Sequence, residues 1–313
     1  MKLRNFQFAL FAKPILFEGI PTVGSMGPLV YDYTQAGQHL WPKDYPNCGG
    51  SWQSPVIVAA SRSIALPLPA LEMVGYRNFL RPPVVMKNNG HTVVISSKKS
   101  ANKSKSPYIF GAMLEEKIEY EFESFHFHWG IRNSRGSEHV LHGTRYPLEM
   151  HLLHRNKKYV NVESALDHED GLAVLAVFFH LEEEDNEILK PIIAHLAEVQ
   201  WINSQTIMNY TFALSSLLPR DLDTFYTYKG SLTSPPCNEA VTWMVFASTV
   251  PISFQQMSKF RLLSSGKGIL ADNYRYLQDL GSRKVYVRRM KNANASKNQL
   301  FDIDVATLKW NWQ

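Results

Sequence analysis

Cysteine is scarce in this chain, because only Cys48 and Cys237 occur among its 313 residues. Two cysteines are too few for a disulfide-rich scaffold. They could close one large loop through a single disulfide, or they could remain two buried free thiols. The count alone leaves both possibilities open.

Long hydrophobic runs and clusters of positive charge are also absent. No stretch reaches the roughly 18 apolar residues of a membrane-spanning helix. Lys and Arg give a net charge of +5, but they are scattered, and no run is long enough for a nucleic-acid patch. We therefore expect a soluble protein with no transmembrane span and no nucleic-acid partner.

The composition fits one large β-rich domain, because 45% of the residues are hydrophobic and can bury a substantial core. We predict that this domain spans residues 30–290. Residues 1–29 show no consistent period and are expected to be a leader or N-terminal arm, although they make an atypical signal peptide. Residues 291–313 are expected to be a polar C-terminal tail.

Several segments have the pattern of strands. An Asn-Gly step at 89–90 lies between two β-rich runs, 84–86 and 92–95, and predicts a tight hairpin. The continuous apolar run 173–179 predicts a buried strand, and we expect 160–162 to be buried as well.

Two segments have the pattern of helices. Residues 191–200 begin with a proline and carry apolar residues at helical spacing. Residues 253–263 begin with Ser253, followed three residues later by Gln256, which is the pattern of a capping box. By contrast, residues 40–50 are aromatic and rich in turn formers, and we expect a loop there.

The most informative stretch is 121–130, where His126 and His128 are two residues apart. In an extended strand such residues point to the same face. Glu149 and His151 repeat the spacing, so two neighbouring antiparallel strands could place three imidazoles around one point. Three nitrogen ligands leave the fourth tetrahedral position of a zinc ion open, as a catalytic site requires. A lone His between aromatic residues is more often an ordinary interior side chain.

Four segments together form a specific pattern. They are Ser-Phe-His-Phe-His-Trp-Gly at 124–130, Gly-Ser-Glu-His at 136–139, Glu-x-His-Leu-x-His at 149–154 and Gly-Ser-Leu-Thr-Ser-Pro-Pro at 230–236. Their order and separations resemble those of α-class carbonic anhydrases, in particular extracellular animal-type members. The resemblance runs from about Tyr31 to about Arg288.

This resemblance implies a mainly β (α+β) single domain, with a large, twisted, mostly antiparallel central sheet and a few surface helices. It implies reversible hydration of carbon dioxide to bicarbonate and a proton by zinc-bound hydroxide. In this family the zinc-bound water has a pKa of about 7. The implied zinc ligands are His126, His128 and His151.

The resemblance also implies roles for other residues. Thr233 takes the hydroxide proton and donates its own to Glu138, and His91 shuttles protons from an exposed, mobile position with a pKa near 6.5. Residues behind the zinc histidines or beside the ordered water would be Glu149, Ser124, Asn273, Tyr33 and Asn89. Residues contacting the substrate would be Leu153, Val174, Leu232, Val241, Trp243 and Ser234.

Three positions depart from the pattern of fast members. Ser124 stands where most active members have a glutamine behind His126, and a hydroxyl is shorter. Leu153 replaces a frequent valine and narrows the substrate pocket, and Val94 replaces a polar residue that often faces the ordered water. We expect an active enzyme with moderate turnover.

The family pattern further implies a disulfide between Cys48 and Cys237, and cis peptide bonds before Pro55 and Pro236. The disulfide favours secretion or an extracellular location. Asn-x-Ser/Thr triplets at Asn102, Asn209 and Asn294 would then be glycan acceptors, although such triplets are common by chance. We expect a monomer.

Two alternatives remain open. A non-catalytic carbonic-anhydrase-related domain keeps the fold and binds partners, but such domains usually lack a zinc histidine, and none is missing here. A cupin-like β-barrel metalloenzyme also uses His-x-His on a strand. The Leu-Thr-Ser-Pro-Pro segment and the strand that contains Trp243 argue against a cupin.

Overall fold

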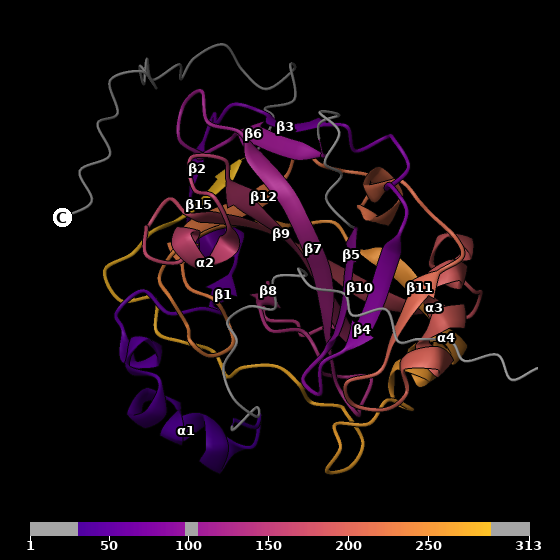
Figure 1. Cartoon of the computed structure of the whole chain (residues 1–313). Coiled ribbons are helices and arrows are strands. Elements are labelled where there is room, and N and C mark those ends of the chain that lie inside the picture. Colours follow the sequence, from indigo (N-terminus) through magenta and orange to yellow (C-terminus); the bar gives the residue numbers. More distant parts are fainter. Residues whose placement is uncertain (1–30, 98–105, 289–313) are drawn as a thin grey trace, which may run out of the picture.

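The computed structural model describes residues 31–97 and 106–288 (Figure 1). The predicted leader, the whole polar tail and the acceptors Asn102 and Asn294 lie outside the described residues. Within them, no helix has both the length and the apolar character that crossing a membrane requires. The helices are α1 (Gln35–Asp44), α2 (Val162–Ala165), α3 (Lys190–His195) and α4 (Phe254–Phe260), with 3₁₀ turns η1 (Pro46–Gly49), η2 (Ala60–Arg62), η3 (Glu187–Leu189), η4 (Leu196–Val199) and η5 (Leu214–Leu217).

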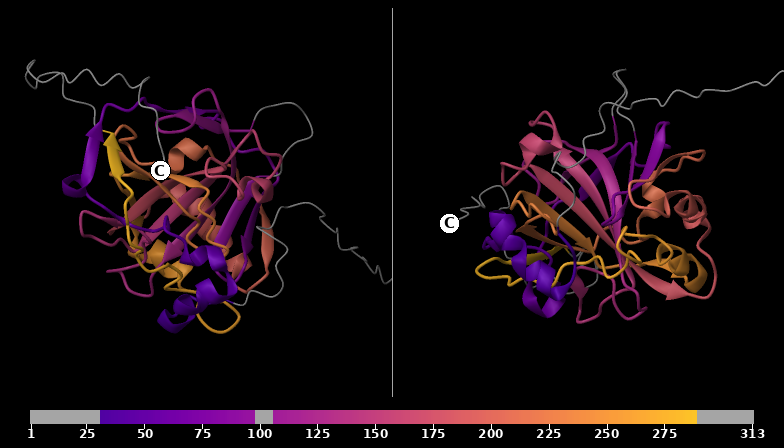
Figure 2. Two further views of the ribbon diagram at one scale, coloured as in Figure 1. Left: turned by 90° about the vertical axis from the view of Figure 1, so that its left-hand side faces the viewer. Right: turned by 60° about the horizontal axis from the view of Figure 1, so that its bottom comes forward.

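A large twisted sheet dominates the fold (Figures 1 and 2). Its main path runs β11-β4-β5-β7-β9-β10-β13-β12-β15-β2, and most pairs are antiparallel, as expected. The parallel pairs within it are β10 with β13, β10 with β14, and β15 with β2. The strands are β1 (Ile57–Val58), β2 (Ser63–Leu66), β3 (Leu71–Val74), β4 (Val84–Asn88), β5 (Val93–Ser97), β6 (Tyr108–Gly111), β7 (Tyr120–Trp129), β8 (Val140–Leu141), β9 (Leu148–Asn156), β10 (Leu172–Glu182), β11 (Gln205–Met208), β12 (Phe225–Gly230), β13 (Val241–Phe246), β14 (Val250–Ser253) and β15 (Val285–Arg288).

Each face of the sheet has its own hydrophobic core. On one face, side chains such as Met150 and Leu175 pack with Ile192 of α3 and Phe260 of α4. On the other face, alternate residues of the same strands, such as Val174, form a second core with the β12 and β13 aromatics. The odd-numbered residues of β9 point to this second face, because successive strand residues alternate.

A β-bulge in β7 decides which side chains reach the second face. The register shifts between Phe122 and Ser124, which pair with adjacent residues of β9. Before the bulge Phe122 packs in the first core, and after it Phe125 and Phe127 do. The extra residue changes the alternation, so His126 and His128 turn to the second face. The three-residue spacing between Phe122 and Phe125 was the sequence signal of this bulge.

Most predicted elements are confirmed. The Asn-Gly step connects β4 to β5, and Gly90 has a positive φ of 87°. The segment 191–200 is helical as α3 and η4, and Ser253 and Gln256 form a reciprocal capping box at α4.

Two predictions were wrong. The segment 160–162 is no buried strand: Val160 is 88% exposed, and Asn161 caps α2 through its side chain. The predicted loop at 40–50 begins inside α1, which Thr34 caps by accepting a hydrogen bond from the N–H of Gly37. Pro42 lies in the last turn of α1, two residues before the helix ends.

The structure confirms the disulfide between Cys48 and Cys237, 189 residues apart in sequence. It also confirms cis peptide bonds before Pro55 and Pro236, and it shows a third before Pro83 that the sequence analysis missed. Within the chain-entropy description, closing a loop of this length stabilises the fold by about 5 kcal/mol.

His154 of β9 is fully buried in the first core. Its Nδ1–H donates to the carbonyl of Ala173, and its Nε2 accepts from the hydroxyl of Tyr76. Burial lowers the pKa of His154 to about 3. The imidazole is therefore held neutral, whereas in the unfolded chain it titrates near 6.5.

This buried histidine predicts acid destabilisation. Below about pH 6.5 His154 binds a proton in the unfolded chain but stays neutral in the folded chain. The free energy of unfolding therefore falls as pH decreases toward 3. One such group contributes at most about 1.4 kcal/mol per pH unit. Urea unfolding between pH 6.5 and 4 should show a shallower decline for His154→Gln, whereas the exposed control His39→Gln should match the parent. An unchanged slope in His154→Gln would contradict the assignment.

Candidate metal centre

Three histidines converge on the second face of the sheet. His126 of β7 lies directly opposite His151 of β9, and His128 lies opposite Glu149. The ring centroids are 5.0 Å apart for His126 and His128, 5.3 Å for His126 and His151, and 4.7 Å for His128 and His151. One nitrogen of each ring lies within 4.8 Å of the others.

Hydrogen bonds set the tautomers of two of these rings. Nδ1–H of His128 donates to the carbonyl of Asn273 at 2.7 Å, and Nε2–H of His151 donates to Glu149 at 2.7 Å. The lone pairs of His128 Nε2 and His151 Nδ1 are therefore free. His128 Nε2 is buried without a hydrogen-bond partner among the described residues. Two outward N–H donations with inward lone pairs fit a bound cation.

All three imidazoles are neutral at physiological pH. Burial lowers the pKa of His128 to about 4 and holds that of His151 below its usual value. Burial, together with the neighbouring His128 and His151, also lowers the pKa of His126. Neutral imidazole is the form that binds zinc, so these residues fit a Zn²⁺ ion.

Glu149 is the centre of a buried hydrogen-bond network. Its Oε1 accepts from His151 and from Nδ1–H of His139, both at 2.7 Å, and its Oε2 accepts the backbone N–H groups of Glu138 and His139. Burial acts to raise the pKa of Glu149, but His139 and His151 hold it well below its usual range. The carboxylate therefore stays ionised.

His139, for which the sequence predicted no role, extends this network. Its Nε2 accepts from the hydroxyl of Tyr228 at 2.7 Å, and that hydroxyl lies 3.0 Å from Ser54 Oγ. His139 therefore connects the metal centre to Tyr228 of strand β12. The sequence signal for this role was the position of His139 directly after Glu138, inside the Gly-Ser-Glu-His motif.

His126 lacks such support. No hydrogen bond to its ring, from Ser124 or any other group, is present among the described residues. Ser124 lies two positions before His126 on β7 and is opposite Leu153 on β9 and Ser96 on β5. Ser124, the expected partner of His126, is shorter than the glutamine of most active members. His126 is also the predicted zinc ligand whose ring no hydrogen bond orients among the described residues.

Glu138 lies beside the histidines. Its Oε2 is 3.4 Å from His128 Nε2 and 3.8 Å from His151 Nδ1, and its Oε1 accepts the backbone N–H of Arg275 at 2.8 Å. Burial raises the pKa of Glu138 to about 7, whereas His151, the nearby Thr233 hydroxyl and the backbone N–H of Arg275 act to lower it. A cation between the histidines would further favour the ionised carboxylate.

Thr233 is 95% buried, in the loop between β12 and β13. Cys237 closes this loop, since its N–H donates to the carbonyl of Ser234 and its sulfur is bonded to Cys48. The disulfide therefore anchors the segment that brings the Thr233 hydroxyl to Glu138.

Apolar side chains line the sheet beside the histidines. Leu153, Val174 and Trp243 lie directly opposite one another across β9, β10 and β13. All three are at least 92% buried, and the Trp243 ring is 4.8 Å from the ring of His151. Val241 and Leu232 belong to the same cluster. The predicted substrate residues thus form one continuous apolar wall, with Ser234 in the neighbouring loop.

His91 is not in the environment that we expected. It is only 8% exposed, and its ring stacks on Tyr31 with centroids 3.9 Å apart and planes 11° apart. Burial and the nearby charge of Lys267 lower the pKa of His91 to about 4, against the opposing effect of Asp32. The expectation of an exposed histidine that titrates near neutrality is therefore corrected.

Two further residues lie around His91. Asn89 uses its side-chain oxygen to accept the backbone N–H groups of His91 and Thr92, which fixes the hairpin turn. Tyr33 packs edge-on against His91 with centroids 6.0 Å apart, and its hydroxyl lies near that of Tyr31. Tyr31 also reaches Ser234 through its hydroxyl, so it bridges the shuttle position and the Thr233 loop.

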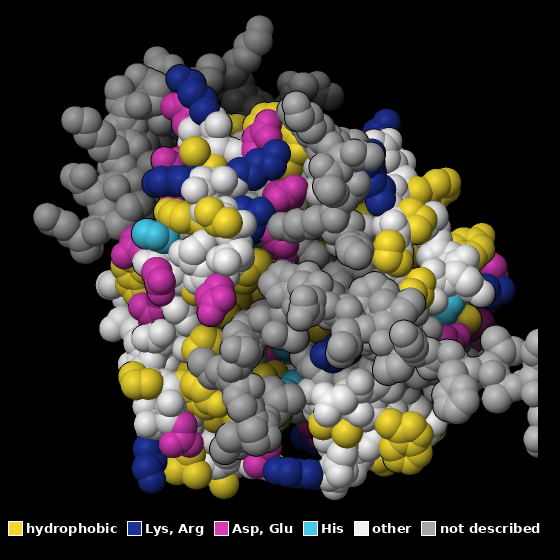
Figure 3. Space-filling model, in the orientation of Figure 1, with side chains coloured by type: hydrophobic (Ala, Val, Ile, Leu, Met, Phe, Trp, Pro, Cys, Tyr) yellow, Lys and Arg dark blue, Asp and Glu magenta, His cyan; other side chains and the backbone are white. Residues whose placement is uncertain are grey.

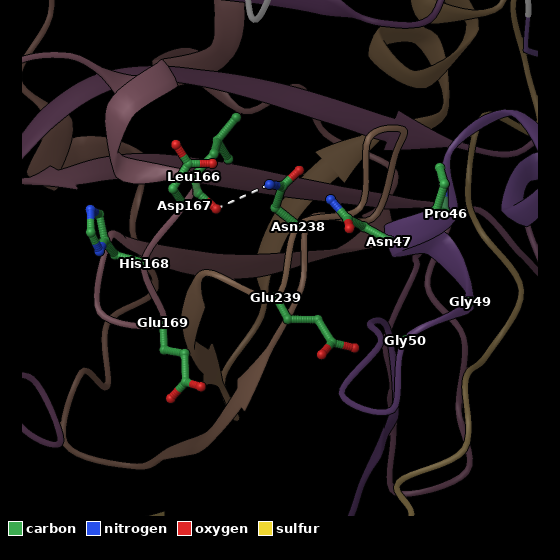
Figure 4. Close-up of a pocket in the computed structure, with 10 residues that line it drawn as sticks. All are labelled: Pro46, Asn47, Gly49, Gly50, Leu166, Asp167, His168, Glu169, Asn238 and Glu239. Carbon is green, nitrogen blue, oxygen red and sulfur yellow. Dashed lines mark hydrogen bonds between the residues drawn. The ribbon is translucent and has the colours of Figure 1, made fainter.

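A pocket of about 490 Å³ lies elsewhere, between the disulfide loop, the turn after α2 and the start of β13 (Figure 4). Asn238 spans its wall by donating to the carbonyl of Leu166. Glu239 points to the 50–53 segment, where it accepts the N–H of Trp52 and the amide of Gln53. None of the predicted metal, catalytic or substrate residues lines this pocket.

Comparisons with known proteins agree with the geometry. A sequence model of the family "Eukaryotic-type carbonic anhydrase" matches residues 36–289. Carbonic anhydrase 6 of Homo sapiens is 35% identical over 281 residues, covering 87% of this chain and 88% of that protein. Carbonic anhydrase 15 of Mus musculus is 36% identical over 284 residues, covering 87% and 86%. The cupin-like alternative is thereby excluded, and the chain belongs to the eukaryotic-type, α-class carbonic anhydrase family.

Proposed function

We propose that this protein hydrates carbon dioxide reversibly to bicarbonate and a proton, with one zinc ion held by His126, His128 and His151. The observation that carries the proposal is the orientation of the free lone pairs of His128 and His151 toward one point beside His126. Neutral ligands preserve the full double charge of the metal. When bound, zinc would lower the pKa of a water molecule to about 7, the value known for carbonic anhydrases.

Thr233 and Glu138 orient the reacting water. Glu138 already accepts the Arg275 N–H on one oxygen, and its other oxygen is free to accept the hydroxyl proton of Thr233. A Thr233 hydroxyl that donates to a carboxylate can only accept from the water. That acceptor fixes the water proton and directs a water lone pair at the substrate.

Carbon dioxide is small and uncharged, so an apolar wall suits it better than hydrogen-bond donors. Leu153, Val174, Leu232, Val241 and Trp243 supply such a wall beside the histidines. Ser234, in the loop between β12 and β13, is proposed to contact the substrate as well. Leu153 is larger than valine and reduces the space at the position opposite Ser124.

The alternative is a non-catalytic carbonic-anhydrase-related domain that binds a partner. All three histidines are present and share one face, together with Glu138 and Thr233. We therefore favour the enzyme, and the zinc measurement below separates the two functions.

We further propose that the protein is a secreted or extracellular monomer. The support is the disulfide between Cys48 and Cys237, a bond that persists in oxidising compartments. An exposed glycan acceptor, Asn209, agrees with the same route.

The zinc site predicts a specific loss of metal. Purified protein should contain one zinc per chain and hydrate carbon dioxide, and His128→Asn should lose most of both, because one of three ligands is removed. The exposed His39→Asn is the matched control and should keep both. Elemental analysis and stopped-flow hydration assays measure the outcome. A zinc content that is absent, or unchanged in His128→Asn, would favour the partner-binding function.

Because His126 has no hydrogen-bond partner among the described residues, we predict that Ser124→Gln raises the affinity for zinc. A longer amide can reach the His126 ring and orient it, and such outer contacts change metal affinity or activity by 10–100-fold. We expect zinc affinity in Ser124→Gln to rise roughly tenfold, measured by competition with a chelator. Ser124→Ala should change it little. Equal affinities in all three proteins would show that Ser124 does not limit His126.

The burial of His91 predicts that Tyr31 restrains proton transfer. Tyr31→Ala should expose the His91 ring and return its pKa from about 4 toward 6.5, measured by NMR titration of the imidazole. Hydration in dilute buffer should then rise. The half-exposed Tyr276→Ala serves as control.

The substitution His91→Ala tests whether His91 is the proton shuttle. It should lower hydration in dilute buffer, and added imidazole should restore the rate, whereas Thr233→Ala should stay slow with imidazole. Full activity of His91→Ala in dilute buffer would remove the shuttle role and leave the zinc site untouched.

A further inference from the structure

β11 is the last strand at one end of the sheet. In the described part of the chain it pairs with β4 and with no other strand. The other side of an edge strand presents unpaired N–H and C=O groups, which can pair with the edge of another chain. This edge therefore requires protection in a protein that stays monomeric.

Exposed apolar side chains surround this edge. Ile207 of β11 is 54% exposed, Tyr210 just beyond it is 61% exposed, and Phe79 is 72% exposed. Phe79 belongs to the same region, because it bridges to Ala213 and its neighbour Leu80 accepts the hydroxyl of Thr211. Figure 3 shows hydrophobic side chains on the right-hand side, where Figure 1 places β11. An apolar patch beside an open strand edge favours self-association.

Asn209 lies in the middle of this region and is exposed. It follows β11 directly, at a bend two residues after Ile207, and both side chains are exposed. Met208, which lies between these two residues, is buried. The backbone N–H of Asn209 donates to Nε2 of His195, and the residue is exposed to solvent. With Thr211 two residues on, Asn209 has the acceptor pattern for N-linked glycans.

We propose that Asn209 carries an N-linked glycan that covers the β11 edge and keeps the protein monomeric. The side-chain amide nitrogen bonds to C1 of the reducing-end sugar of a diphosphate-activated oligosaccharide. The amide loses one proton, and the diphosphate leaves. A bulky hydrophilic chain at this position shields Ile207, Tyr210 and Phe79 and blocks the approach of a second strand.

This proposal rests on the secretory location proposed above, but not on catalysis. β11 is separated from β7 by β4 and β5, so three strand spacings place it about 14 Å from the strand that carries His126 and His128. Loss of the glycan should therefore leave zinc content and hydration unchanged. These measurements distinguish failure of this proposal from failure of the zinc site.

The experiment uses the full chain secreted from animal cells that make high-mannose glycans. Glycopeptide mass spectrometry should find Asn209 occupied. Endoglycosidase H then trims the glycan to one sugar, and Asn209→Gln removes the acceptor. Analytical ultracentrifugation should show self-association at least roughly tenfold tighter in both than in the untreated protein. Thr211→Ser keeps the acceptor pattern and should stay monomeric, and Ile207→Lys added to Asn209→Gln should restore the monomer.

Four results would overturn the proposal. One is an unoccupied Asn209 in secreted protein. Another is a trimmed protein that remains as monomeric as the untreated one, a comparison that holds even if Asn209→Gln fails to fold. The third is self-association that Ile207→Lys does not reverse. A chain without any glycan that still hydrates carbon dioxide would remove the secretory route and this proposal, while keeping the zinc site.

Discussion

The pairing of β7 with β9 is the constraint on which the rest of the site depends. Because His126 lies opposite His151, a shift of one residue would send one of these rings into the opposite core. The bulge before Ser124 makes this pairing compatible with aromatic packing on the other face, since Phe122 and Phe125 both stay in the first core. Metal geometry and core packing are thus two consequences of one strand register.

The buried carboxylate of Glu149 then sets the tautomer of His151 and the position of Glu138. Glu149 is fully buried, and an isolated carboxylate there would be costly, but its four hydrogen bonds offset the loss of water. Two of the four come from backbone N–H groups in the loop that carries Glu138. The charge that sets the tautomer of His151 therefore also holds Glu138 beside it.

The sequence predicted features that depend on neighbours along the chain and missed features that depend on distant contacts. The hairpin at Gly90 and the cap at Ser253 follow from a few adjacent residues, and the zinc histidines follow from two-residue spacing. The burial of His91 does not, because it results from Tyr31, which is 60 positions earlier in the chain and folds over the hairpin. Val160 is a miss of another kind, because its strand-like neighbours were weighed above a local signal, the cap that Asn161 forms with Ser164.

The supports of the three histidines differ in a way that bears on rate. His128 and His151 are each oriented by an outward hydrogen bond, whereas His126 depends on packing alone among the described residues. A ring that is free to rotate loses part of the alignment that lowers the free energy of metal binding. At the same time, a shuttle histidine with a pKa of about 4 is a poor acceptor from water that titrates near 7, because transfer is uphill by about 4 kcal/mol. Ser124 thus limits metal binding and Tyr31 limits proton removal. Because these positions are separate, one process can change without the other.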